Sequence, residues 1–482
     1  SFARIARIAG DSHRCLSICV QQPRCKRCRR IASLSIATAQ PPAASVQPPR
    51  GANAVAATIA CTDKMAAQHD MSADIKLAEQ NASSITLGID GAPHDPQKLT
   101  AMLRKHGMTQ TVVSCELVHE LAQPNSITGA LDLALDDGST KRLFVKKMTA
   151  AQVAHKAWND RRRSLLYMRN EVRFYSEFPE LGERGVRYPT VYGVEDQLEK
   201  VTGQLGGEVP EEPSDLSKCG ALLWMEPVLG YDQGSPLPAD KSALILSAVA
   251  RLHSASWEDT DLLRRASERL QHPGGSFALK IRNPAELEKI IPNWETFVKN
   301  FAKEAPAGFF DKRADLGQRL RRAAPWVAAQ LAPAPSDKHA CLVHGDLKAM
   351  NAFLPRDSPD PDALLIDFAS TGVGYGMADV AMHLTHALMP GDLRTHEADL
   401  LQRYLRFLGQ DDYDPQLARR HYELATIDYG RFVLGRFWGA ASPDSFWEKR
   451  HKSNVALVHR NVPAALHFVE RLDAYLAKYE GE

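Results

Sequence analysis

The chain has 482 residues, of which 44% are hydrophobic and 24% are charged, and its formal net charge is +1. These proportions are typical of a globular protein, and the near-zero charge argues against nucleic acid or an anionic membrane as a partner. No apolar run reaches the roughly 18–20 residues of a membrane-spanning helix, so we expect no membrane span.

The first 80 residues differ from the rest and are left out of the fold prediction. Residues 1–60 carry nine Lys and Arg against one acid, Asp11. This composition is typical of an organellar transit peptide; a disordered tail, or sequence that is not native, fits it as well. Cys25-x-x-Cys28 and two upstream cysteines also fit a four-thiolate zinc site. We therefore expect a cytoplasmic protein, or an organellar one if this segment is a transit peptide.

Residues 81–228 predict an N-terminal lobe built on a small antiparallel sheet with one principal helix. Asp137-Gly138 is a tight hairpin signal between two strands, and the polar stretch 196–218 predicts a loop. The expected elements are a helix over 95–107, strands over 111–121 and 129–148, a helix that ends near 178, and strands over 188–195 and 220–228.

Residues 229–482 predict a larger helical lobe. Apolar residues at the helical period begin at Ile245 and continue through Leu252. Apart from a hairpin over 351–368, the later segments are expected to be helical, over 284–304, 311–331, 379–389, 395–409, 414–440 and 446–479. The fold class is therefore α+β, with two lobes and a ligand expected in the cleft between them.

The stretch "LVHGDLKAMNAF" places Asp346 five residues before Asn351, and the hairpin that follows returns the chain to Asp367 in "LLIDF". Phosphoryl transfer needs one carboxylate to accept a proton, and a carboxylate with an amide oxygen to hold Mg²⁺. We interpret Asp346 as the base, and Asn351 and Asp367 as the metal ligands. The alternative is that these residues only cap a turn and end a strand.

Two upstream residues complete a nucleotide site. Lys146 ends the strand "RLFVKKM" and is expected to reach the α- and β-phosphates. Glu171 lies on the next helix, where it can pair with that lysine and orient it. Lys147 is the alternative cation, although the alternation of side chains along the strand favours Lys146.

Lys146, Glu171, "HGDLKAMN" and "IDF", in this order, resemble the aminoglycoside-phosphotransferase and choline-kinase superfamily. The stretches "EVRFYSEF" and "DFASTGVGYGMADVAMHL" are most similar to its CHK-kinase-like branch, which includes ecdysteroid-kinase-like proteins. The resemblance implies a protein-kinase-like fold and an ATP-dependent small-molecule phosphotransferase. It also implies that Asp379 anchors the catalytic loop, and that Lys348 helps to neutralise the transferred phosphoryl group.

The sequence departs from that pattern in its phosphate loop. In place of a glycine-rich turn stands "AQPNSITGAL", where Ser126 and the amides near Gly129 are expected to hold phosphates. The adenine is expected against the backbone near Met225 and Glu226. Ala369 stands where branch members often carry a polar residue, which affects substrate positioning rather than chemistry.

A small hydroxylated acceptor is expected rather than a protein. Only eleven residues separate Asp367 from Asp379, too few for a peptide-docking segment, and Gly345 replaces the arginine of protein kinases. Asp428, with the aromatic residues near it (Tyr429, Phe437 and Trp438), fits a pocket for a cationic amino alcohol or, alternatively, the core face of a helix. His383 and His386 are interpreted as structural.

We therefore predict an ATP- and Mg²⁺-dependent kinase for an amino alcohol, a sterol-like or an aminoglycoside-like acceptor. The missing glycine loop motivates the alternative, a catalytically inactive kinase-like binding protein. The sequence gives no prediction of the oligomeric state.

Overall fold

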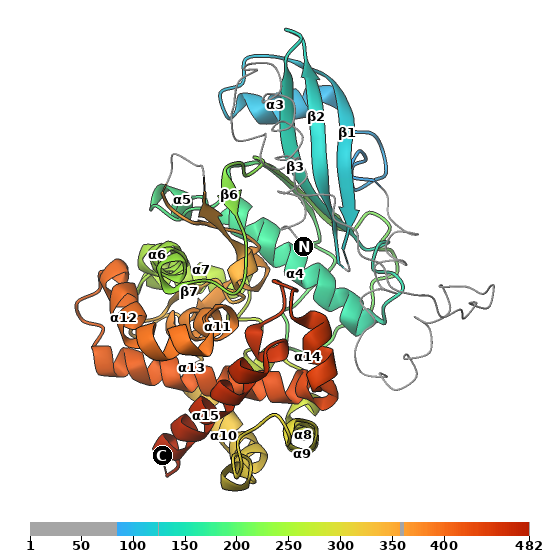
Figure 1. Ribbon diagram of the computed structural model, residues 1–482. Coiled ribbons are helices and arrows are strands. Elements are labelled where there is room, and N and C mark those ends of the chain that lie inside the picture. Colours follow the sequence, from blue (N-terminus) through green and yellow to red (C-terminus); the bar gives the residue numbers. More distant parts are fainter. Residues whose placement is uncertain (1–83, 124, 357–360, 482) are drawn as a thin grey trace, which may run out of the picture. The chain divides into compact units, whose positions relative to one another are not determined.

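The computed structural model describes residues 84–123, 125–356 and 361–481. The first part of the fold is a five-stranded antiparallel sheet (Figure 1). Its strands stand in the order β1-β2-β3-β5-β4. They are β1 (Val112–Ala122), β2 (Ile127–Leu135), β3 (Thr140–Thr149), β4 (Val191–Gln197) and β5 (Gly220–Met225). Gly138 turns the β2–β3 hairpin with a φ of +81°, as the Asp-Gly signal predicted. The predictions for residues 1–80 lie outside the described residues.

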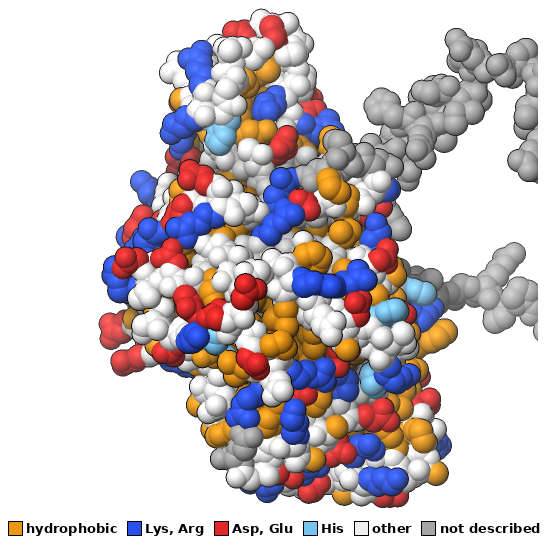
Figure 2. Space-filling model, turned by 90° about the vertical axis from the view of Figure 1, so that its left-hand side faces the viewer, with side chains coloured by type: hydrophobic (Ala, Val, Ile, Leu, Met, Phe, Trp, Pro, Cys, Tyr) orange, Lys and Arg blue, Asp and Glu red, His pale blue; other side chains and the backbone are white. Residues whose placement is uncertain are grey.

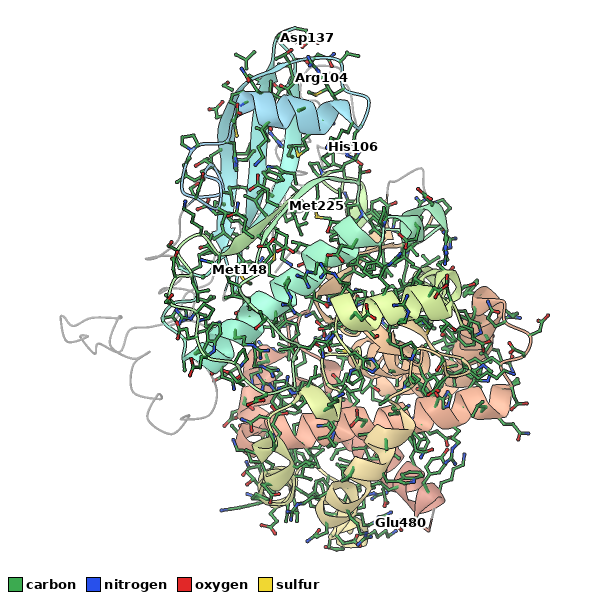
Figure 3. The ribbon with its side chains drawn as sticks, turned by 180° about the vertical axis from the view of Figure 1, so that it is seen from behind. Arg104, His106, Asp137, Met148, Met225 and Glu480 are labelled. Atoms are coloured by element: carbon green, nitrogen blue, oxygen red, sulfur yellow. The ribbon has the colours of Figure 1, made fainter. Side chains whose placement is uncertain are left out.

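The two faces of this sheet pack against different helices. Because side chains alternate along a strand, Leu143 and Val145 of β3 face the core that also contains Leu99 and Leu103 of helix α3 (Pro96–Arg104). Met148 of β3 and Met225 of β5 belong instead to the core shared with α4 (Trp158–Glu177), and both lie between the sheet and that helix (Figure 3). A short helix, α5 (Glu180–Glu183), follows.

The rest of the chain is mainly helical, so the predicted α+β class is confirmed. Its helices are α6 (Ala239–Ala255), α7 (Thr260–Arg269), α8 (Ala285–Glu288), α9 (Ile290–Phe301), α10 (Leu316–Gln330), α11 (Met377–Ala387), α12 (Pro390–Leu408), α13 (Pro415–Arg436), α14 (Pro443–Lys449) and α15 (Val462–Tyr479). Short 3-10 helices are η2 (Leu279–Ile281), η3 (Asp311–Arg313), η4 (Ala349–Asn351), η5 (Phe368–Ser370), η6 (Trp438–Ala440) and η7 (Leu457–His459). The lobe boundaries at 80 and 228 stay predictions.

Short strands hold the loops that face the sheet. The expected hairpin over 351–368 is present as β8 (Ala352–Pro355) and β9 (Leu364–Leu365), and β6 (Tyr231–Asp232) pairs with β8. A second pair, β7 (Cys341–Val343) with β10 (Gly372–Gly374), was not anticipated. The β7–β10 pair joins the strand before the predicted catalytic loop to the segment after Asp367. The β8–β9 pair joins the strand after that loop to the segment before Asp367.

Two predicted helices are interrupted. The helix expected over 284–304 breaks between α8 and α9, where Pro292 lacks an N–H and crowds the carbonyl of Glu288, the last residue of α8. The single helix predicted over 446–479 is wrong, because α14 ends at Lys449 and α15 starts at Val462. Pro463 and the Asn461 side chain, which accepts from the amide of Ala464, set this new start.

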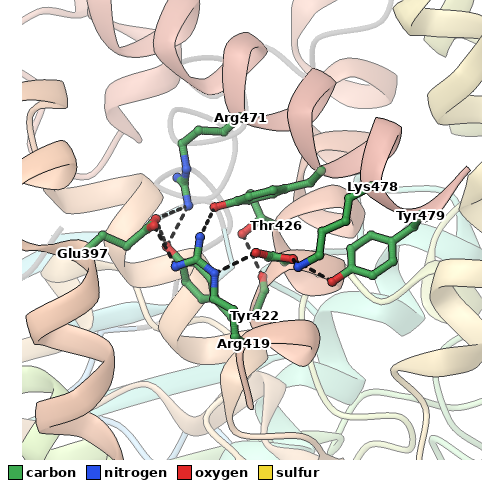
Figure 4. Close-up of polar contacts among 9 residues, drawn as sticks. Glu397, Arg419, Tyr422, Thr426, Arg471, Lys478 and Tyr479 are labelled. Atoms are coloured by element: carbon green, nitrogen blue, oxygen red, sulfur yellow. Dashed lines mark hydrogen bonds and ion pairs between the residues drawn. The ribbon is translucent and has the colours of Figure 1, made fainter. Parts of the chain in front are cut away.

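Partly buried ion pairs join the helices far from the sheet (Figure 4). Glu397 of α12 accepts hydrogen bonds from Arg419 and Tyr422 of α13 and from Arg471 of α15, at 2.7–3.0 Å. Glu423 accepts from Arg419, Lys478 and Tyr479 at 2.6–2.7 Å. We call these seven residues the helix cluster: Glu397, Arg419, Tyr422, Glu423, Arg471, Lys478 and Tyr479.

The surface carries both signs of charge. Figure 2 shows Lys and Arg side chains interspersed with Asp and Glu over the face in view, in keeping with a net charge of +1. Within the described ranges, no helix combines the length and the hydrophobicity that crossing a bilayer requires.

Candidate active site

Strand β3 places its two adjacent lysines on opposite faces of the sheet. Lys146 faces α4, where its Nζ lies 2.5 Å from Oε2 of Glu171 and 3.4 Å from Oδ1 of Asp367. Lys147 faces the other way and donates to the carbonyl oxygens of Ser84 and Leu87 at 3.2 and 2.9 Å. The geometry therefore brings Lys146, and not Lys147, to the predicted metal ligand.

Helix α4 positions both Glu171 and the segment that carries Asp367. The Phe174 ring stacks on Phe368 with centroids 3.9 Å apart. The Asn170 amide donates to the carbonyl oxygens of Phe368 and Thr371 at 3.2 and 2.9 Å. The face of α4 that carries Glu171 thus fixes the backbone on the C-terminal side of Asp367.

The β8–β9 hairpin returns Asp367 to Asn351, as the sequence predicted. The amide of Ile366 donates to the Asn351 carbonyl at 2.9 Å. Asp367 itself has a left-handed φ of +69°, an uncommon conformation outside glycine that marks a locally constrained site. Its side chain is 29% exposed, so one edge of the carboxylate remains open to a ligand.

The catalytic loop gathers its polar groups around Asp346. Lys348 Nζ lies 2.9 Å from Oδ2 of Asp346. The Asn351 side-chain amide donates to the backbone oxygen of Asp346 at 2.8 Å and to Oδ2 at 3.2 Å. Ser276, which sequence reasoning did not identify, donates its hydroxyl to Oδ1 at 3.3 Å.

Asp379, at the start of α11, holds the backbone of this loop. Its two carboxylate oxygens accept the amides of His344 and Gly345 at 2.6 and 2.8 Å. His253 of α6 contacts the same carboxylate at 3.1 Å and pairs through its other ring nitrogen with the Tyr404 hydroxyl at 2.8 Å. The contact of Asp379 with the amides of His344 and Gly345 is the one expected from the family resemblance.

Gly345 permits the close approach of two loops. Its φ is +81°, and a Cβ there would lie 2.2 Å from the Ser370 carbonyl oxygen and 2.8 Å from the Gly275 amide nitrogen. The Gly345 carbonyl accepts the amide of Ser276 at 2.7 Å. Gly274-Gly275 in "HPGGSF" was the available sequence signal for this second loop, because paired glycines mark turns and close backbone approaches.

The electrostatics of the cluster keep opposite charges together. Burial lowers the pKa of Lys146, but the Asp367 and Glu171 carboxylates outweigh burial and raise that pKa above its usual value. Burial would raise the pKa of Asp367, but Lys146 and Lys348 lower it below its usual value. Asp367 is therefore ionised at neutral pH.

Glu171 and Lys348 respond to the same cluster. Burial raises the pKa of Glu171 to about 7 against the attraction of Lys146, and Asp367 adds to the rise. Burial lowers the pKa of Lys348, but Asp346 and Asp367 raise it overall. Lys348 thus stays charged, and the Glu171 carboxyl group holds its proton more tightly than an exposed glutamate does. We call Lys146, Glu171, Asp346, Lys348 and Asp367 the catalytic cluster.

The predicted nucleotide-binding backbone lies on the sheet. Ser126 closes the β1–β2 turn, where its carbonyl accepts the amide of Gln123 at 2.8 Å. Gly129 lies inside β2, paired with Glu120 and Val145, and not in that turn. Met225 ends β5, and the amide of Glu226 donates to the Thr190 carbonyl at 2.8 Å. The phosphate and adenine contacts of these residues remain predictions.

Of the four residues considered for a cationic-acceptor pocket, Asp428, Tyr429 and Trp438 are buried, as the alternative of a core face predicted, whereas Phe437 is 36% exposed. Asp428 is buried and forms an ion pair with Arg431 at 2.6 Å. Trp438 is buried and stacks on Phe297 with centroids 3.9 Å apart. His383 and His386 are also buried on α11, where burial lowers the pKa of each imidazole.

A sequence profile described as the phosphotransferase enzyme family matches residues 135–418, more than half of the chain. No curated protein matches the chain significantly. Among solved structures, an aminoglycoside-3'-phosphotransferase of type VIII aligns at 18% identity over 70% of this chain and 100% of its own, with a TM-score of 0.33. A choline kinase LicA from Streptococcus pneumoniae aligns at 11% identity over 79% and 98%, with a TM-score of 0.35.

An amicoumacin kinase hAmiN, in complex with AMP-PNP, Ca²⁺ and Ami, aligns at 13% identity over 79% of this chain and 93% of its own, with a TM-score of 0.37. At these identities and scores, the evidence for the family comes from the profile and from the geometry of the loop.

Proposed function

The chain belongs to the phosphotransferase enzyme family, and from this premise we propose that it transfers the γ-phosphate of ATP to a hydroxyl group of a small molecule. Family membership confirms the predicted kinase-like fold and phosphotransferase class. The CHK-kinase-like branch remains a prediction.

One observation carries the proposal: residues distant in sequence converge on a single set of charges. Lys146 and Asp367, 221 residues apart, are within 3.4 Å. Lys146 also pairs with Glu171, and Lys348 pairs with Asp346. A structural turn needs no such assembly, whereas phosphoryl transfer requires a cation for the phosphates, a base and metal ligands.

Asp346 is assigned as the base. Its carboxylate is held by hydrogen bonds from Lys348, Asn351 and Ser276, so its orientation is fixed before an acceptor arrives. It takes the proton of the acceptor hydroxyl as the acceptor oxygen bonds to the γ-phosphorus. The bond from that phosphorus to the bridging oxygen breaks, and ADP leaves with the electron pair.

The donor set suits Mg²⁺. The Asn351 amide nitrogen faces Asp346, which leaves the amide oxygen for a cation, and the partly exposed Asp367 carboxylate supplies a second hard oxygen. When bound, Mg²⁺ would neutralise charge on the phosphates. Asn351 and Asp367 would hold it, and we keep these roles as proposals.

The two lysines are assigned to the phosphates. Lys146 is held by Glu171 and faces the open edge of Asp367, a position suited to the α- and β-phosphates of a nucleotide. Lys348 lies beside the base. Its positive charge there stabilises the negative charge on the phosphoryl group more in the transition state than in the ground state.

The acceptor is proposed to be a small molecule because no peptide-docking segment fits between the metal ligand and α11. After Asp367 the chain forms η5, pairs β10 with β7, and enters α11 at Met377. These residues are packed against the catalytic loop itself. Amino alcohols, sterols and aminoglycosides are the acceptor classes to screen, and the Asp428–Arg431 pair removes one argument for a cationic acceptor.

Asp346→Asn tests the assignment. We expect no transfer from ATP to any alcohol of that panel, while ATP with Mg²⁺ still raises the unfolding temperature. A ligand at 100 times its dissociation constant adds about 2.7 kcal/mol of stability, which is readily measured. Asp261→Asn, at an exposed acid in the first turn of α7, is the matched control and should keep full activity. Equal loss of transfer and nucleotide binding in Asp346→Asn would contradict the role of a base.

A further inference from the structure

A second group of potential ligands lies outside the active site. Glu258, His339 and Asp412 each offer one ligand atom, and these three atoms lie within 4.8 Å of one another. We propose that they bind a divalent transition-metal ion of the Zn²⁺ class, in a site separate from the Mg²⁺ proposed for phosphoryl transfer.

The unpartnered nitrogen of His339 is the observation that points to a ligand. The residue is only 7% exposed, and its Nδ1 is buried without a hydrogen-bond partner among the described residues. The nearest acid oxygen, Oε1 of Glu258, lies at 3.5 Å and already accepts the backbone amide of His339 at 2.8 Å. Buried polar atoms normally have a partner, and a metal ion would supply one here.

The three side chains offer one nitrogen ligand and two oxygen ligands. A neutral imidazole with two carboxylates is a donor set for Zn²⁺, whereas Mg²⁺ prefers oxygen ligands alone. This difference in chemistry separates the site from Asn351 and Asp367.

The two acids have the freedom to close around an ion. Ligand atoms about 2.1 Å from a tetrahedral Zn²⁺ lie about 3.4 Å apart, so a contraction of roughly 1 Å is needed. The Glu258 and Asp412 side chains are exposed and can rotate by that amount. Asp412 now pairs with Lys338 at 3.2 Å, but an exposed pair of this kind is weak and readily exchanged.

The site would connect three segments behind the catalytic loop. Glu258 follows the C-terminal end of α6, His339 precedes β7 by two residues, and Asp412 lies in the turn between α12 and α13. The amide of Glu258 donates to the Ala340 carbonyl at 3.0 Å, and Leu342 donates to the Ser256 hydroxyl at 2.8 Å. A bound ion would therefore stabilise the strand that leads into His344.

Zinc stoichiometry of the metal-free full chain tests the proposal. We expect His339→Asn and Asp412→Asn each to bind one Zn²⁺ fewer per chain than the unaltered protein, by calorimetric titration. Asparagine tolerates the φ of +65° at His339, and Asp412 is exposed, so both variants should fold. The N-terminal cysteines and the residues of the active site are the same in all these proteins, so any zinc they bind cancels in the difference.

His467→Asn is the matched control. His467 lies 3.4 Å from Glu470 and has no second acid in a metal-binding group within the described ranges. It should retain the zinc stoichiometry of the unaltered chain. Zn²⁺ should also raise the unfolding temperature of the unaltered chain and of Asp367→Asn, but not that of Asp412→Asn.

Three results would overturn the proposal: the same stoichiometry in the unaltered chain and both variants, loss of zinc in the His467 control, or a zinc-dependent shift that Asp412→Asn retains. Phosphotransferase activity does not enter these measurements, so their failure would leave the proposed function intact.

Discussion

The catalytic cluster and the helix cluster are both partly buried groups of opposite charges, yet one carboxylate of the catalytic cluster, that of Asp367, is used differently. In the helix cluster, Glu397 and Glu423 each accept three hydrogen bonds from charged or phenolic donors. In the catalytic cluster, the Asp367 carboxylate has one lysine at 3.4 Å and a partly exposed edge. Asp346 of the catalytic cluster also accepts three hydrogen bonds, so the partly exposed Asp367 carboxylate is what distinguishes the candidate site.

The origin of the segments differs as well. The helix cluster joins three long helices, of which α13 and α15 also share an apolar core. The catalytic cluster joins a strand, a helix and two loops, one of which carries a non-glycine residue with positive φ, Asp367. Such a conformation persists only where the surrounding structure enforces it. The first arrangement stabilises a fold, and the second holds groups ready for a ligand.

The largest effect is expected from Lys146→Met, compared with Lys147→Met at the adjacent position. Removal of a cation that stabilises transition-state charge should lower kcat/KM for ATP by about 100- to 1,000-fold. Lys147→Met should instead leave kcat/KM within about twofold and lower the free energy of unfolding by about 2 kcal/mol, because two backbone carbonyls lose their donor.

Steady-state kinetics and urea unfolding on both variants check this pair. A loss of activity in Lys147→Met that matches the loss in Lys146→Met would mean that the faces of β3 do not separate the two functions.

The next effect is expected in the helix cluster, where stability should change without activity. Glu397→Gln leaves Arg419 and Arg471 without their common anion. Because the Arg419 side chain is 35% exposed and that of Glu397 17%, the loss of these charged hydrogen bonds should cost about 2 kcal/mol. Asp399, two residues along the same helix, is the control: its side chain is 47% exposed, and Asp399→Asn should cost less than about 0.5 kcal/mol.

Urea unfolding gives both free energies, and kcat per folded molecule should be unchanged in each variant. Reduced kcat in Glu397→Gln would show that the helix cluster affects catalysis, which would contradict its assignment to stability alone.

The contrast also explains what the sequence could reveal. The order Lys146, Glu171, Asp346, Asn351 and Asp367 is visible in the sequence because these residues sit in short motifs whose order matches the groups that phosphoryl transfer needs. The alternation along β3 was enough to favour Lys146 over Lys147. The β8–β9 hairpin followed from a turn-rich stretch between two apolar ones.

Contacts between distant segments were not visible. Gly274-Gly275 marks a close backbone approach before Ser276 but does not name Gly345 as the partner, and nothing near His253 or Tyr404 links them to Asp379. The interruption of the helix predicted over 446–479 also depends on where α14 and α15 find their packing partners. Local patterns identify which groups are required, whereas tertiary packing decides which others touch them.

The smallest effect is expected from pH, where glutamates of the two clusters should respond with opposite signs. The pKa of Glu171 rises from its usual 4.5 to about 7 through burial, so its contribution to stability is complete below pH 4.5 and is lost as the pH rises through about 7.

Burial opposes the shift at Glu423, but hydrogen bonds from Arg419 and Lys478 lower its pKa. Its contribution is present above pH 4.5 and is lost as the pH falls below that value. The free energy of unfolding, measured between pH 3 and 8 for Glu171→Gln and Glu423→Gln, should therefore diverge from the unaltered chain in opposite directions. If the difference in free energy of unfolding changed with pH in the same direction for both variants, the two clusters would not differ in their electrostatics.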